Sequence, residues 1–143
     1  MQTEYSFNLY NSLAKPHKVP VIACIGSDLS VGDSLGPITG TLLKEKLRLL
    51  NCFIYGTLQK PITAHEIRYI NKFLRQSHPD SPIIAVDAAV GSSGDIGLIK
   101  IANHGVKPGS GSNKKLGMVG DISVMGIIAE KSLFNLSITE WRI

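Results

Sequence analysis

The stretch GSDLSVGDSLGP at residues 26–37 decides how this chain folds. It follows a short apolar run at 19–25 that is rich in β-branched residues and ends at a glycine, which is typical of a buried strand. It precedes residues 38–50, where apolar side chains recur at helical spacing. Pro37 suits the first helical turn because its missing N–H costs nothing there. The stretch is therefore predicted to be a loop at the carboxyl end of a strand, with Asp33 just ahead of a helix.

A second carboxylate ends another predicted strand. Residues 82–86 read PIIAV, an apolar run that stops at Asp87. A carboxylate at the end of a buried strand is costly unless it is paired or hydrogen-bonded. Asp87 therefore fits both a hydrogen-bond anchor for the next turn and a functional site, because perturbed carboxylates occur in both settings.

The order of the predicted elements favours an α/β fold. Besides 19–25 and 82–86, strands are predicted at 52–55, 96–102 and 124–129. A capping box formed by Thr63 and Glu66 opens a second helix. Strands that alternate with helices predict a mostly parallel sheet in three α/β/α layers. A chain that starts centrally places its second and third strands on either side of the first. Asp33 and Asp87 would then meet at the crevice where ligands bind.

Composition places the chain among ordinary globular proteins. Its 143 residues suffice for one domain with a buried core, and 43% hydrophobic and 18% charged residues are usual values for such a domain. No apolar run approaches the roughly 20 residues that span a bilayer. The first residues lack the basic and apolar regions of a signal peptide. We expect an N-terminal extension at 1–18, a single α/β domain at 19–143, a cytoplasmic location and no membrane contact.

The charge pattern and the cysteines limit the partners further. A net charge of +4 permits weak attraction to acidic molecules and establishes none. The basic residues of the second helix are predicted to lie on solvated faces without interleaved aromatics, so nucleic acid is not expected. Cys24 and Cys52 fall in predicted buried strands outside any Cys-x-x-Cys motif, which indicates reduced packing thiols.

A polar loop at residues 106–115 combines glycine, serine and lysine. The phosphate-binding patterns Gly-x-x-x-x-Gly-Lys-Ser/Thr and Gly-x-Gly-x-x-Gly are both absent from the sequence, so nucleotide binding is not indicated. Composition alone predicts a mobile surface loop.

Three motifs, in this order, resemble a known family: DSLGP at 33–37, VDA at 86–88 and KPGSG at 107–111. They resemble the germination protease of spore-forming bacteria, and the match is closer to the YyaC-type sporulation proteins, which are small single-domain relatives. Shorter matches extend the resemblance over roughly residues 19–130. More distantly, the loops around Asp33 and Thr57 resemble those of hydrogenase maturation endopeptidases.

The resemblance implies a fold and a set of site residues. The fold is phosphorylase/hydrolase-like, with a mixed sheet of about five strands of which one is antiparallel. Asp33 and Asp87 correspond to the catalytic aspartates of the germination protease. Substrate contacts are implied at Asp28, Gly56, Thr57, Lys107, Gly109, Ser110, Asn113 and Asp121.

Paired aspartates suit peptide hydrolysis. One carboxylate can activate water while the other, protonated, donates to the carbonyl oxygen or the leaving amine. Two carboxylates close together cannot both ionise cheaply, so their proton affinities split. Asp33, ahead of a helix N-terminus, is expected to be ionised, and Asp87, at the end of a buried strand, is expected to hold the proton. The assignment belongs to the coupled pair, and the geometry of the site could reverse it.

The expected geometry is one cleft shared by both aspartates. Thr57 and Asp121 are expected on its rim, because they belong to motifs that match the family. Lys107 and Lys114 are expected near its mouth, since the polar loop matches the same loop of the germination protease.

Two alternatives stay open beside the peptidase. A sporulation factor can keep this fold and its aspartates as a binding module without catalysis. A site formed by Asp33, Asp87 and Asp121 could also hold a hard divalent cation through oxygen ligands. In the maturation endopeptidases the matching positions hold nickel with a histidine, where this chain offers Asp121, so no resident cofactor is expected. In the peptidase and binding-module readings the partner is a protein or peptide, such as a spore protein.

Overall fold

The computed structural model describes residues 18–27, 29, 32–46, 51–108 and 117–131. Nearly all of the predicted N-terminal extension lies outside these residues. The elements in chain order are β1 (Val21–Cys24), the 3-10 turn η1 (Gly32–Ser34), α2 (Leu35–Lys46), β2 (Phe53–Tyr55), α3 (Ile67–Ser77), β3 (Ile83–Gly91), the 3-10 turn η2 (Ser93–Asp95), β4 (Ile99–Ala102) and β5 (Ile122–Glu130).

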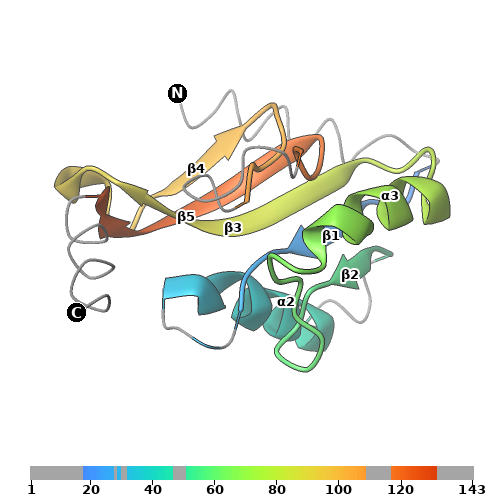
Figure 1. Cartoon of the computed structure of the whole chain (residues 1–143), viewed down its shortest axis with the longest axis horizontal. Coiled ribbons are helices and arrows are strands. Elements are labelled where there is room, and N and C mark those ends of the chain that lie inside the picture. Colours follow the sequence, from blue (N-terminus) through green and yellow to red (C-terminus); the bar gives the residue numbers. More distant parts are fainter. Residues whose placement is uncertain (1–17, 28, 30–31, 47–50, 109–116, 132–143) are drawn as a thin grey trace.

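The strands form one five-stranded sheet in the order β2-β1-β3-β5-β4. β2, β1, β3 and β5 run parallel to one another, and β4 pairs with β5 in the antiparallel direction. The predicted α/β class with a mostly parallel mixed sheet is confirmed. The prediction that the chain starts centrally is also confirmed, since β2 and β3 lie on either side of β1 (Figure 1).

The strands differ in length, and this shapes one end of the sheet. β1 has 4 residues, whereas β3 and β5 have 9 each. β1 pairs with β3 from Val21 opposite Ile83 to Cys24 opposite Val86, and β3 then continues beside β5 as far as Gly91. Figure 1 shows β3 and β5 running on past the end of β1.

β1 ends because the chain turns away at Gly26. This glycine has a φ of +148°, in a region that side chains rarely adopt, and a Cβ there would lie 2.0 Å from the Asp33 carbonyl oxygen. Ile25 already leaves the sheet to form a bridge with Ile62. The Ser27 N–H then donates to the Asp33 carbonyl oxygen at 3.0 Å. These contacts hold Asp33 beside the end of β1.

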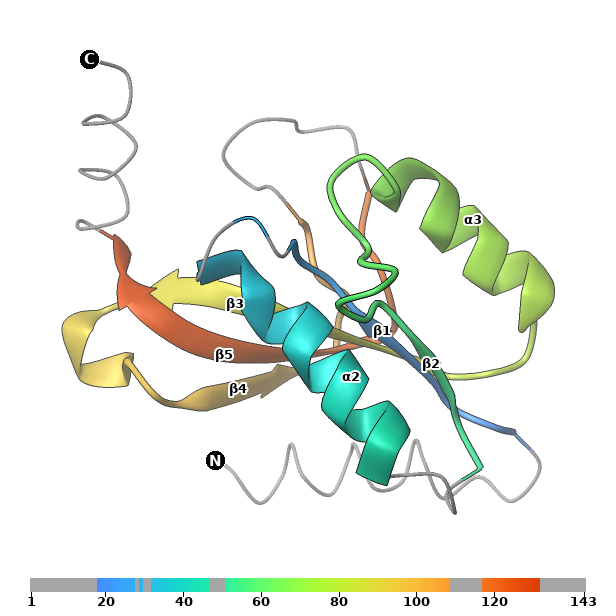
Figure 2. The same cartoon turned by 90° about the horizontal axis from the view of Figure 1, so that it is seen from below.

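The two helices pack on opposite faces of β1, because successive side chains of a strand point to opposite faces. On one face Cys24 meets α2, where a Cβ added at Gly40 would lie 3.3 Å from the Cys24 Cβ. Figure 2 shows α2 lying across this side of the sheet. On the other face Val21 and Ala23 belong to a buried apolar cluster that includes Ile67 and Leu74 of α3. Burial of this face is what fixes the register of the strands.

Cys24 and Cys52 are both free thiols, as the sequence predicted. Cys24 is fully buried, and burial raises its pKa to about 12, so it is an inert packing group. Cys52 is partly exposed just before β2, so the prediction that it lies in a buried strand is wrong.

The element bounds differ from the predicted ones in two instructive places. α2 begins at Leu35, three residues before the predicted start at 38, because η1 leads directly into it. α3 begins at Ile67, after the predicted capping residues. The Glu66 carboxylate does accept the Thr63 N–H at 2.8 Å, but it closes a turn that precedes the helix.

We predict that Gly40→Ala destabilises the fold although alanine is the better helix former by roughly 1 kcal/mol. The added Cβ would lie 1.9 Å from the Gly56 carbonyl oxygen, so α2 must move away from β2. The expected loss in the free energy of unfolding is about 2 kcal/mol or more, measured by urea denaturation. Glu45→Ala, on the exposed side of the same helix, is the control, and a Gly40→Ala protein as stable as wild type would show that the two backbones do not meet.

Candidate functional site

Asp33 and Asp87 line one cleft at the carboxyl end of β1. The cleft has a volume of about 980 Å³, and its walls come from η1, β3, β5, the turn before α3 and the segment after β4. This is the end of the parallel strands at which open α/β sheets place their ligands. The two carboxylates therefore meet where the sequence predicted, although they lie 54 positions apart in the chain (87 minus 33).

Asp87 is the more deeply placed of the two carboxylates. It is the first residue of β3 beyond the last pair with β1, and its Oδ1 accepts the Ala88 N–H at 2.8 Å. Burial raises the pKa of Asp87 to about 7. The Ala88 N–H opposes this rise, and the nearby charge of Asp33 adds to it. At neutral pH the Asp87 side chain is thus divided between its acid and its ionised form.

Asp33 approaches from the other wall. It is exposed, and it lies in η1 directly ahead of α2, where the partial positive charge of a helix N-terminus favours a carboxylate. Its charge acts on the pKa of Asp87, so the two groups are near enough to interact electrostatically. The raised pKa of Asp87 has the direction expected for a group that holds a proton.

Two histidines and a lysine complete the polar lining. His65 lies in the turn before α3, and His104 and Lys107 follow β4. The His104 Nδ1 lies 2.9 Å from the Gly105 carbonyl oxygen, which orients the ring. Lys107 was predicted near the cleft, and the structure places it in the lining. The two histidines were not predicted, because they reach the cleft from turns that no sequence pattern connects with the aspartates.

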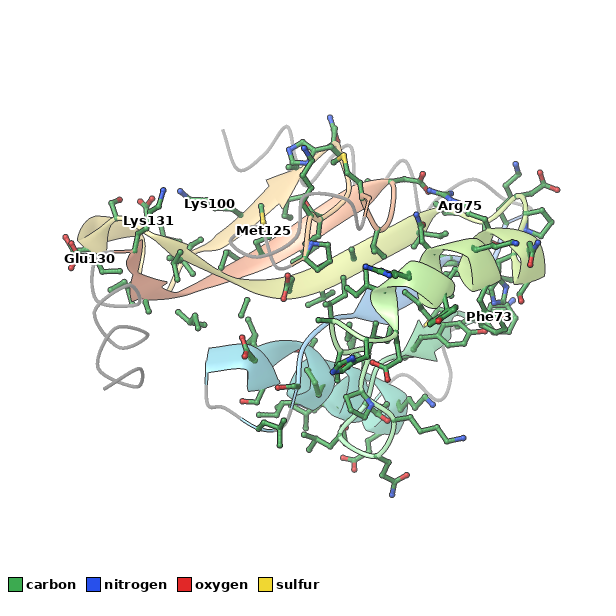
Figure 3. The ribbon with its side chains drawn as sticks, viewed as in Figure 1. Phe73, Arg75, Lys100, Met125, Glu130 and Lys131 are labelled. Atoms are coloured by element: carbon green, nitrogen blue, oxygen red, sulfur yellow. The ribbon has the colours of Figure 1, made fainter. Side chains whose placement is uncertain are left out.

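Most of the remaining lining is apolar. It comes from the residue after β1, from the start of α3 and the segment before it, from the segment after β4 and from β5, among them Ile25, Ile62, Ile67, Val106 and Met125. Met125 stands opposite Asp87 in the β3–β5 register and is labelled in Figure 3. An apolar wall excludes water and strengthens the electrostatic interactions inside the cleft.

The prediction that Asp121 lies on the rim of this cleft is wrong. The Arg75 guanidinium donates to both Asp121 carboxylate oxygens, at 2.7 and 3.2 Å, and the Ile83 N–H donates to Oδ2 at 2.9 Å. Ile83 begins β3, so Asp121 lies at the amino ends of the strands. Figure 3 shows Arg75 on α3, at the end of the sheet away from Glu130 and Lys131 of the β5 end. The reason is that Asp121 comes just before β5 begins, whereas Asp87 lies in β3 just after its pairing with β1 has ended.

Thr57 and Gly56 also do not line the cleft, so Thr57 was wrongly placed on its rim. Thr57 is buried, and its hydroxyl accepts the Lys60 N–H at 3.2 Å. Gly56 has a φ of +84°, and a Cβ there would lie 1.8 Å from the Cys24 carbonyl oxygen. Both residues shape the chain where β2 ends.

Four predicted substrate residues lie outside the described residues: Asp28, Gly109, Ser110 and Asn113. Lys114, expected at the cleft mouth, lies outside them as well. The described part of the chain holds no group of three histidine, cysteine, aspartate or glutamate side chains that could bind a metal ion. With Asp121 at the far end of the sheet, the three-carboxylate cation site cannot form.

The fold and the cleft define an α/β protein with a pair of carboxylates at the carboxyl ends of its central strands. The chain belongs to the family described as Protein of unknown function (DUF1256), whose model matches residues 1–142. It is 38% identical over 128 residues to the uncharacterized protein YyaC of Bacillus subtilis (strain 168). This confirms the YyaC-type resemblance.

The alignment with YyaC covers 90% of this chain and 60% of that protein, so the chain spans well under two thirds of its relative. No solved structure matches the chain. Among the helices that the structure describes, none combines the length and the apolar character needed to cross a membrane.

We predict that Asp87→Asn stabilises the fold at pH 8 and not at pH 4. The folded pKa of about 7 lies above the ordinary value of 3.8, so the folded state binds the proton more tightly. The wild-type free energy of unfolding must therefore fall as the pH rises from about 4 to about 7. The asparagine still offers an oxygen to the Ala88 N–H and cannot ionise.

The expected gain at pH 8 is on the order of 2 kcal/mol, because relaxation around the ionised group relieves part of the full shift. Urea denaturation of both proteins from pH 4 to pH 8 measures it. Parallel curves for wild type and variant across this range would contradict the burial of Asp87 in its acid form.

Proposed function

We propose that this chain is a peptidase of the germination-protease type, in which Asp33 and Asp87 hydrolyse a peptide bond with a water molecule. The observation that carries the proposal is the shared cleft, in which one carboxylate is exposed beside a helix N-terminus and the other is partly buried with a pKa of about 7. General acid–base catalysis requires a group that still holds its proton near neutral pH, and the raised pKa of Asp87 supplies one beside a second carboxyl group.

Each group has a defined role in the proposed reaction. The Asp33 carboxylate takes a proton from water, and the resulting hydroxide oxygen bonds to the carbonyl carbon of the substrate. The Asp87 acid donates its proton to the carbonyl oxygen, so the tetrahedral intermediate is neutral at that oxygen. The C–N bond then breaks as the proton held by Asp33 passes to the leaving amine, and Asp87 regains its own proton from the hydroxyl group.

The family resemblance supports the same reaction. Asp33 and Asp87 stand at the positions of the catalytic aspartates in the germination protease motifs, and the sheet has the single antiparallel strand that this fold implies. The phosphorylase/hydrolase-like layering and a role in the cytoplasm of a sporulating cell are parts of this proposal. The substrate class is then an extended protein segment, such as one from a spore protein.

A binding module without catalysis is the second candidate function. Its supporting observation is the hydrogen bond from the Ala88 N–H to Asp87 Oδ1 at 2.8 Å, which gives the buried carboxyl a structural role. A divalent cation held by Asp33 and Asp87 alone is the third candidate, and hard cations prefer such oxygen ligands.

We predict that Asp33→Asn and Asp87→Asn each lower the cleavage rate at least about a hundredfold, because each removes one half of the acid–base pair. The assay follows cleavage of a spore-protein extract and of a broad panel of unstructured peptides by mass spectrometry. Asp80→Asn is the matched control, since Asp80 is exposed and its nearest cation is Lys18 at 3.9 Å. Equal cleavage by wild type and both cleft variants would rule out the paired acids. Absence of cleavage together with capture of a spore protein would favour the binding module.

The pH profile gives an independent prediction. If Asp87 must carry its proton, kcat/KM falls tenfold per pH unit above the pKa of about 7 that burial gives this group in the free protein. Initial rates on one cleaved peptide between pH 5 and pH 9 measure this fall in kcat/KM. A rate that rises steadily up to pH 9 would show that Asp87 acts only in its ionised form.

A further inference from the structure

Beyond the end of β1, one edge of β3 has no strand partner among the described residues, and this edge lies beside the two carboxylates. The Val86 carbonyl oxygen accepts the Ile25 N–H at 2.7 Å, and this is the last bond between the first strand and the third. β3 continues to Gly91 with β5 on its other side. Because backbone groups alternate between the two edges of a strand, those of Ala88 and Val90 face the side that β1 leaves. No strand within the described ranges pairs with this edge.

The open edge forms part of the cleft. Ala88 and Val90 belong to its lining together with Asp33 and Asp87. Unpaired strand edges present a row of N–H and C=O groups that an extended chain can bind, and this is a recurrent mode of peptide recognition. A segment bound there would continue the line of β1 and pass directly over Asp87.

We propose that the cleft takes its polypeptide as an added strand along the Ala88–Val90 edge of β3. The inference rests on the proposed function for the nature of the bound molecule, a peptide. It adds how the peptide is recognised: through its main chain, with every second side chain directed at the apolar wall formed by residues such as Ile62, Val106 and Met125.

The added strand also affects the protonation of Asp87. In the structure the Ala88 N–H is accepted by Asp87 Oδ1, so an incoming peptide carbonyl competes for the same donor. Loss of that bond removes an interaction that lowers the pKa of Asp87, and the acid form is then favoured. Strand addition thereby leaves Asp87 protonated beside the carbonyl group that it serves.

The test uses the acetylated peptide amide Thr-Val-Thr-Val-Thr-Val-Thr, whose β-propensity and alternation suit an added strand. The protein is the full chain with Asp33→Asn, which prevents turnover. Binding is followed by NMR chemical shifts at about 1 mM peptide, a concentration at which a millimolar complex is half formed. The expected result is that the Ala88 and Val90 amide resonances shift, while those of Tyr69 and Lys72 on the exposed side of α3 stay in place.

A series of peptides carrying a single N-methyl group is the matched control, because methylation removes one N–H and changes little else. Methylation at every second residue should weaken binding roughly tenfold, and methylation at the intervening residues should leave the affinity almost unchanged. The inference would be overturned if the Ala88 and Val90 amide resonances did not shift on peptide addition. It would also be overturned if the effect of methylation on affinity did not alternate from one peptide residue to the next.

Cleavage by the wild-type protein is measured separately, so failure of the peptidase proposal is distinguishable. Strand binding without cleavage would remove the catalytic proposal and leave the docking mode in place. Cleavage at a rate that does not depend on backbone methylation would support the peptidase proposal and contradict binding of the peptide as an added strand.

Discussion

The hydrogen bond from the Ile25 N–H to the Val86 carbonyl oxygen is the interaction on which the rest of the site depends, because no bond between β1 and β3 follows it. Had β1 run as far as β3, strand pairing would have covered the position beside Asp87. The early turn at Gly26 instead opens a cleft at the middle of the sheet. A glycine is needed there since the backbone approaches Asp33 too closely for a side chain. One conformational requirement thus ends the strand, opens the cleft and positions one of its carboxylates.

The same constraint explains why the carboxylates differ. Asp87 belongs to the longer strand and stays paired with β5 after β1 has ended, so it is partly buried and desolvation is the largest influence on its pKa. Asp33 belongs to the segment that has left the sheet, so it reaches solvent at the start of α2. The asymmetry follows from the unequal lengths of two paired strands, without any specialised residue in the cleft.

The fold and the central pair could be predicted from sequence because both rest on local patterns. The strand ends before Gly26 and after Val86 mark the carboxyl ends of parallel strands, and connection rules bring such ends together. Asp121 was misplaced because a matching motif does not say which end of the sheet it occupies, although its position before a strand carried that information. His65 and His104 were missed since their convergence arises from turns at different edges of the sheet.

Asp121 acquires a different meaning from its contacts. It binds Arg75 near the carboxyl end of α3 and the first N–H of β3, and thereby links the helix to the amino end of the central strand. The opposite end of the same helix begins beside His65 in the cleft wall. The helix α3 is therefore bound to Asp121 at its carboxyl end and contributes a residue to the cleft wall at its amino end. Since Ile67 of the same helix lines the cleft, loss of the Asp121–Arg75 contact would act on the cleft wall through α3, although neither residue lines the cleft.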